Sequence, residues 1–152
     1  MLGKKFFQGK VPTEVVEKYR RHIFLGAKDV FGKKFKGYSK SYGEKKRSNT
    51  FKGQAARFAN TKAPVLTGQL LRAFNKRSAK PKVEQNGFSF GWNIFGNRVE
   101  HLRKLGRVLT SEFQPMPEGI IRYMNNEAGK HIFKNMQKKF GANTTTFHKI
   151  KK

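Results

Sequence analysis

The sequence contains no cysteine, few acids and no long apolar run. Without cysteine, disulfide bonds and thiolate metal sites are excluded, and the composition fits assembly in a reducing, intracellular compartment. No apolar segment approaches the ~20 residues that a membrane-spanning helix needs. The N-terminal stretch Met1–Lys10 carries three lysines without a following apolar core of signal-peptide length. We therefore expect neither a membrane partner nor a targeting segment.

The scarcity of acids also argues against catalysis. A metal-dependent nuclease needs two or more carboxylates that converge on Mg²⁺, and the sequence has nine acids in all, with no recognisable cluster. The four histidines lack the spacing of metal ligands, and Gly32–Gly37 lacks the Gly-Lys-Ser/Thr ending of a phosphate-binding loop. The sequence thus predicts a protein that is not an enzyme and has no metal site, no cofactor and no small-molecule substrate.

Positive charge is what the chain has in excess. Lysine and arginine total 34 of 152 residues, which gives a net charge of +25. A chain with this charge repels itself, so an anionic partner is expected beside it. Nucleic acid, an anionic membrane and an acidic protein surface would all fit. Nucleic acid is favoured, because cations that neutralise phosphates gain the free energy of counterion release.

The charge is concentrated in residues 32–62, where ten cations accompany a single acid, Glu44. No apolar period is sustained there, which predicts a long basic loop or arm, functional or merely a flexible surface insertion. Its candidate contacts with phosphate or an acidic neighbour are Lys33, Lys34, Lys36, Lys40, Lys45, Lys46, Arg47, Lys52 and Arg57. Tyr38 and Tyr42 could stack on bases if a single strand were bound. The spacing shows no base-reading signature.

Two long helices are predicted, over 12–31 and 117–140. In the first, Val15 or Val16, Tyr19, Ile23, Ala27 and Val30 recur every three or four residues and form one apolar stripe. In the second, the stripe comprises Ile120 or Ile121, Met124, Ala128, Ile132, Met136 and Phe140. Residues 141–152 are polar and basic and are expected to form a mobile tail.

Strand signals lie between the helices. Asn86-Gly87 favours a tight hairpin turn between strands at 77–85 and 88–94. In the second strand, aromatic residues alternate with small polar ones from Phe88 to Ile94. Short helices are predicted at 67–74 and 99–105, the latter ended by Gly106, and a further strand at 108–113. The prediction is one α+β domain over 1–140: a small antiparallel β-sheet packed against two long α-helices, with a long basic loop.

One eight-residue motif resembles a known family. The motif reads Ala63-Pro64-Val65-Leu66-Thr67-Gly68-Gln69-Leu70. It is similar to the Ala-Pro-x-x-Thr-Gly-x-Leu signature of bacteriophage neck, tail-completion and virion-morphogenesis proteins. In that family, as here, the motif follows a helix and a basic segment and precedes a hairpin, a Gly-ended stretch, a Pro turn and a last helix. Family members often carry Arg between the late prolines, where this chain has Met116.

The resemblance implies a virion structural protein at the head–tail junction, assembled in the host cytoplasm. It would be a subunit of a neck-adaptor, tail-completion or tail-terminator ring that touches portal or adaptor proteins, tail proteins and packaged double-stranded DNA. The alternative is a basic RNA-binding protein of ribosomal type, in which Phe88, Phe90 and Trp92 would form an exposed stacking platform. RNA-bound monomers would favour the alternative, and ring-shaped particles would favour the virion protein.

Overall fold

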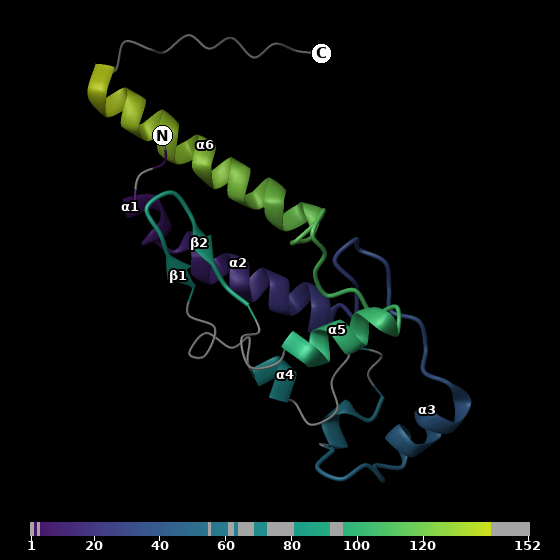
Figure 1. The fold of residues 1–152 in the computed structure, drawn as a ribbon. Helices are drawn as coiled ribbons and strands as arrows, with labels where there is room; N and C mark the ends of the chain where they lie inside the picture. Colours follow the sequence, from purple (N-terminus) through teal and green to yellow (C-terminus); the bar gives the residue numbers. More distant parts are fainter. Residues whose placement is uncertain are drawn as a thin grey trace, which may run out of the picture.

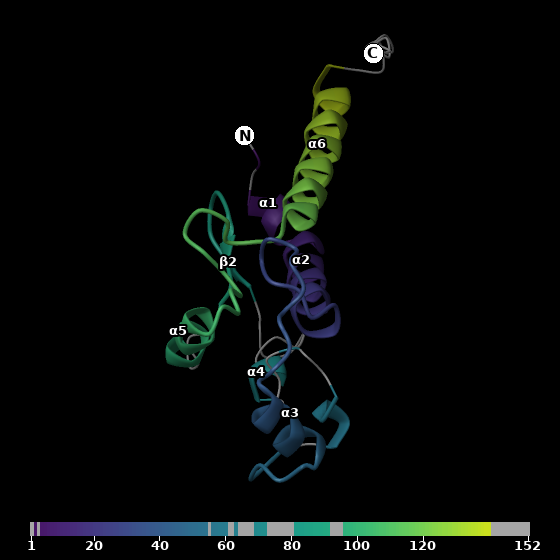
Figure 2. The ribbon, with the colours of Figure 1, turned by 90° about the vertical axis from the view of Figure 1, so that its right-hand side faces the viewer.

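The computed structural model describes residues 2, 4–54, 56–60, 63, 69–72, 81–91 and 96–140 of the chain. This part is mostly helical and includes a two-stranded antiparallel sheet. The elements are α1 (Lys4–Phe7), α2 (Val11–Arg20), the π-helical turn η1 (Arg21–Leu25), α3 (Lys40–Arg47), the 3₁₀ turn η2 (Ala56–Phe58), α4 (Gln69–Arg72), β1 (Lys82–Val83), β2 (Phe88–Ser89), α5 (Gly96–Lys104) and α6 (Glu118–Phe140). The molecule is elongated, with α3 at one end, the last turns of α6 at the other, and α2 between them (Figure 1, Figure 2).

Helix α2 forms the centre of the hydrophobic core. Its predicted apolar stripe is confirmed, because Val15, Val16 and Tyr19, with Ile23 in η1, are all buried. The first half of α6 packs against α2. The hydroxyl of Tyr19 also donates a hydrogen bond to the backbone carbonyl of Leu109. One face of α2 therefore holds together segments that lie far apart in the sequence.

The helical backbone that begins at Val11 ends at Leu25, so the predicted extension to Phe31 is wrong. Gly26 closes it at a point where a Cβ atom would lie 2.7 Å from the carbonyl oxygen of His22. The chain then turns back, and Lys28 pairs with Lys34 in an antiparallel bridge. Apolar spacing alone does not reveal this stop, because the residues after it still keep the helical period.

Val30 shows why the apolar period continues past the end of the helix. Its side chain is fully buried, but it reaches the core from a loop, where its backbone N–H donates to the carbonyl of Val108 at 3.0 Å. Val30 also accepts a hydrogen bond from the Gln114 side chain at 3.0 Å. These two bonds hold the segment after η1 against the segment before α6.

The hairpin is confirmed, with its turn one residue earlier than predicted. Val83 pairs with Phe88, and Lys82 with Ser89. The backbone N–H of Glu84 donates to the carbonyl of Gly87 at 2.9 Å, so the turn is centred on residues 85 and 86. The predicted alternation holds within the described part of the second strand: Ser89 is exposed, and Phe88 and its neighbour Phe90 are half-buried.

The connection from α5 to α6 agrees with the sequence prediction only at Gly106, where α5 ends. Gly106 follows α5 with a φ of 72°, a left-handed conformation that favours glycine and ends the helix. The strand predicted at 108–113 is wrong, because these residues follow a bent path. The N–H of Ser111 bonds the carbonyl of Gln114 at 3.3 Å, and Phe113 is 96% exposed.

The expected α+β fold is therefore found in outline. The structure has one long helix, α6, in its described part, and the sheet is a short hairpin packed on α1 and α2. The rings of Phe7 and Phe88 lie 6.2 Å apart, and those of Tyr19 and Phe90 meet edge-on at 5.8 Å.

Two residues of the eight-residue motif, Ala63 and Leu70, have described side chains, and both are buried in the hydrophobic core. Residues 64–68, residues 77–80 of the predicted strand at 77–85, Trp92, Ile94 and the predicted tail lie outside the described residues.

Candidate nucleic-acid interface

The segment predicted as a long basic loop is partly ordered into short helices. We refer to residues 33–54 and 56–60 as the basic lobe. It contains α3 and η2 and lies at the opposite end of the molecule from the end of α6 (Figure 1). The prediction of one long loop or arm is wrong where α3 and η2 form, and the aromatic residues of this segment pack against one another. They provide a local core that composition alone did not reveal.

Three aromatic residues of the lobe pack against one another with tilted rings. The rings of Tyr38 and Tyr42 lie 4.8 Å apart, and those of Tyr42 and Phe51 lie 4.9 Å apart. The Tyr38 hydroxyl donates to the carbonyl of Ala63 at 2.8 Å. Both tyrosines are half-buried in this cluster. They hold the lobe together, so the predicted stacking of free nucleic-acid bases on Tyr38 and Tyr42 has no support in this arrangement.

Arg107 fastens the lobe to the rest of the molecule. Its guanidinium lies 4.2 Å from the centre of the Tyr38 ring and 5.4 Å from that of Phe35, which is buried in the core. It also donates to the carbonyl of Lys36 at 2.9 Å. This role of Arg107 is not predictable from the sequence, because the residue simply follows the glycine that ends α5.

The end of α3 is capped by polar side chains. The Ser48 hydroxyl donates to the carbonyl of Glu44 at 2.9 Å, and the Thr50 hydroxyl to that of Lys45 at 3.0 Å. The Gln54 amide donates to the carbonyl of Lys46 at 2.5 Å. These bonds satisfy carbonyls that a helix end leaves free. The basic residues in the last turn of α3 also interact favourably with the negative end of the helix dipole.

Eight of the nine predicted contact residues have exposed side chains. They lie on α3, on η2 and on the loops around them: Lys33, Lys34, Lys36, Lys40, Lys45, Arg47, Lys52 and Arg57. Glu44, the one acid of the lobe, is exposed among them. The lobe therefore presents many cations and a single carboxylate to its surroundings, on a framework that α3 and the aromatic cluster fix in place.

Lys46 is the exception among the nine. Its side chain is only 2% exposed, so it is not available for a surface contact, and its inclusion as a contact residue is wrong. Its ammonium donates to the Tyr38 hydroxyl at 3.3 Å and lies 4.4 Å from the centre of the Tyr38 ring. Burial, with a smaller contribution from the nearby Arg107 charge, lowers the pKa of Lys46 to about 8.

The basic lobe has the chemistry of a phosphate-contacting surface. Ammonium and guanidinium groups bind phosphate oxygens without reading base sequence.

Among the described residues, no group of three or more His, Asp or Glu side chains could hold a metal ion. None of the described helices has both the length and the apolar character that a bilayer span requires.

Comparisons with protein-family models, with curated proteins and with solved structures found no match to this chain. The resemblance of residues 63–70 to the phage proteins thus remains a prediction from the motif and from the order of elements around it.

Proposed function

We propose that the chain is a structural protein of a bacteriophage virion, a ring subunit of the head–tail connector. It would join the capsid portal to the tail as a neck-adaptor, tail-completion or tail-terminator subunit. Its basic lobe would lie beside packaged DNA or beside acidic neighbouring subunits. The protein would perform no catalysis.

The observation that carries the proposal is the set of eight exposed cations on a structured lobe. Cations held on a folded framework lose less conformational entropy on binding than cations on a flexible arm. Contacts to phosphate position a nucleic acid without specifying its sequence, as a DNA conduit requires. The motif at 63–70 and the order of elements around it add the link to phage connectors.

The alternative of a ribosomal-type RNA-binding protein receives less support. It requires the hairpin aromatics to form an exposed platform. Phe88 and Phe90 are instead half-buried, with their rings stacked at 6.2 Å on the side of the hairpin that packs on α1 and α2. Phe88 and Phe90 therefore pack toward the hydrophobic core and do not form an exposed platform.

Electron microscopy of the purified, nuclease-treated protein, alone and in its native particle, tests the proposal. Ring-shaped oligomers, and the same density at the head–tail junction of virions, are the expected result. Monomers that retain RNA through high salt and nuclease treatment would contradict it and favour the ribosomal-type alternative.

A further inference from the structure

The second half of α6, residues 129–140, exposes apolar side chains along one side of the helix. Ile132, Phe133, Met136 and Phe140 are 43%, 46%, 44% and 64% exposed. At roughly 100° per residue, these four positions fall within an arc of about 100° around the helix axis, which we call the apolar arc. This half of α6 extends beyond the rest of the described molecule (Figure 1, Figure 2). An amphipathic helix gains most of its stability by burying such a face.

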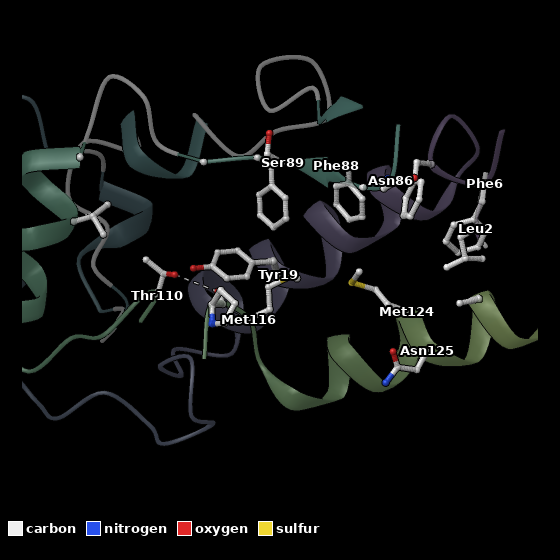
Figure 3. A pocket seen from close by; sticks show the side chains of 18 of the residues that line it. Leu2, Phe6, Tyr19, Asn86, Phe88, Ser89, Thr110, Met116, Met124 and Asn125 are labelled. Atoms are coloured by element: carbon white, nitrogen blue, oxygen red, sulfur yellow. Dashed lines mark hydrogen bonds between the residues drawn. The ribbon is translucent and has the colours of Figure 1, made fainter. Parts of the chain in front are cut away.

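The side of α6 that packs on the body of the molecule is a different one. Met124 points across an apolar pocket toward Phe88 of the hairpin (Figure 3). One turn before the end of this contact side, the ring of His131 lies 5.1 Å from that of Phe6 in α1. Counted from His131, Met136 lies roughly 140° around the helix axis. The centre of the apolar arc therefore faces away from α1 and the hairpin, so a broad, flat surface can reach it.

Lysines occupy the rest of the circumference of this half of α6, which contains four of them and no acid. Lys130 is paired with Glu127, at 2.6 Å. No carboxylate of the described residues forms an ion pair with Lys134, Lys138 or Lys139, and all three are exposed. Lys134 and Lys138 lie on the side opposite the apolar arc, and Lys139 borders the arc. Three cations are thus available to an anionic partner.

The apolar arc distinguishes the end of α6 from the basic lobe. In the lobe, aromatic rings pack against one another and the cations are exposed, which suits the phosphates of a nucleic acid. On α6, large apolar side chains are exposed beside the cations. The phosphates of a duplex give such an arc nothing apolar to be buried in. An anionic bilayer presents negative headgroups directly above acyl chains, so it accepts both the apolar arc and the lysines.

We infer that the second half of α6 lies on an anionic lipid surface, with the apolar arc at the acyl chains and its lysines near the headgroups. The helix is about 10 Å across, so lysines on its outer side stay within a Debye length of the headgroup charge. The expectation of no membrane partner depends on the absence of an apolar run of ~20 residues, which excludes a spanning helix but not one that lies in the interface. The inference goes beyond the proposed function and does not depend on it.

Single cysteines report on the apolar arc directly, since the natural chain has none. Met136→Cys and Lys134→Cys, exposed positions on opposite sides of α6, are each labelled with a fluorophore whose emission shifts to the blue away from water. The full-length proteins are treated with nuclease and mixed with vesicles of equal parts phosphatidylglycerol and phosphatidylcholine. The label at 136 is expected to shift to the blue and to be quenched by brominated acyl chains, while the label at 134 stays in water.

Three outcomes of the labelling experiment would overturn the inference. A label at 136 that stays in water on vesicle-bound protein would show that the basic lobe or the net charge alone holds the protein on the lipid. A label at 136 that is already shielded from water in the free protein would show that the chain covers the apolar arc itself. Shielding in the assembled native particle, but not on vesicles, would indicate that a groove of another protein is the partner.

Two variants of unchanged net charge measure what the apolar arc contributes to vesicle binding. Met136→Gln with Phe140→Gln removes two exposed apolar side chains from the arc, and Leu105→Gln with Phe113→Gln removes two that are 62% and 96% exposed elsewhere. In sedimentation with the same vesicles at ~0.15 M salt, the arc variant is expected to bind at least roughly tenfold more weakly than the natural chain, and the control within about twofold of it. The natural chain is also expected to bind phosphatidylcholine alone at least roughly tenfold more weakly than the mixed vesicles. Equal losses in the two variants, or equal binding to the two kinds of vesicle, would overturn the inference.

Discussion

Neutralising four exposed cations of the basic lobe is expected to weaken binding to double-stranded DNA by about 100-fold at ~0.1 M salt. The variant carries Lys40→Gln, Lys45→Gln, Arg47→Gln and Lys52→Gln, all at exposed positions on α3 or just after it. Each lost phosphate contact removes the release of roughly one counterion, so the slope of log affinity against log salt should fall by about 0.9 per contact. Fluorescence anisotropy with a labelled duplex over a range of salt concentrations measures both effects.

A variant with the same loss of charge elsewhere is the matched control. Lys82→Gln, Lys104→Gln, Lys138→Gln and Lys139→Gln remove four exposed cations outside the lobe. It is expected to lose much less affinity, because only the general field of the protein is reduced. Equal losses in the two variants would show that net charge alone, rather than the basic lobe, binds DNA.

Replacing the buried Lys46 by methionine is expected to stabilise the protein at pH 7 by about 1–3 kcal/mol. Lys46 is 2% exposed and faces Tyr38 and Arg107, so its charge is both desolvated and close to a second cation. Methionine keeps a flexible chain of similar length without the charge. The Tyr38 hydroxyl keeps its bond to Ala63. Urea denaturation measures the free energy of unfolding, with the exposed neighbour Lys45→Met as control. A less stable Lys46→Met variant would contradict this reading.

The natural chain and Lys46→Met are also expected to differ in how their free energies of unfolding depend on pH. The pKa of Lys46 is lowered to about 8 in the folded state, against about 10.4 for lysine in an unfolded chain. Between these values the unfolded state binds more protons, so the natural chain gains stability as pH rises. The advantage of Lys46→Met is therefore expected to be full below pH 8 and to shrink from pH 8 toward pH 10. A constant difference across this range would show that the charge of Lys46 is not the cause.

The sequence predicted those elements whose local signals agree with the tertiary structure. The stripe through Val15, Tyr19 and Ile23 marks a face that the core buries. The end of α5 follows from Gly106, because its left-handed backbone is costly for other residues. The start of α6 follows from Pro117, the residue just before it. In each case one residue type or spacing is sufficient to specify the local structure.

The predictions are wrong where a contact between residues far apart in the sequence determines the local structure. The helical backbone of α2 and η1 ends before Gly26, and Val30 is then held in a loop by a bond from Gln114, 84 residues away in sequence. The segment at 108–113 has the composition of a strand, but no strand of the described chain pairs with it. Lys46 looked like its basic neighbours, and only the packing of Tyr38 and Arg107 around it removes it from the surface. Local sequence carries no signal of such contacts.

The central claim is that the cations of the basic lobe lie against a polyanion. Lysine acetylation of the free protein and of its complex with double-stranded DNA, read residue by residue by mass spectrometry, tests it most directly. The account predicts that DNA protects Lys33, Lys40 and Lys45, that Lys138 at the far end of α6 stays reactive, and that buried Lys46 reacts slowly in both states. Unchanged acetylation of the lobe lysines in the complex, with protection elsewhere, would contradict it.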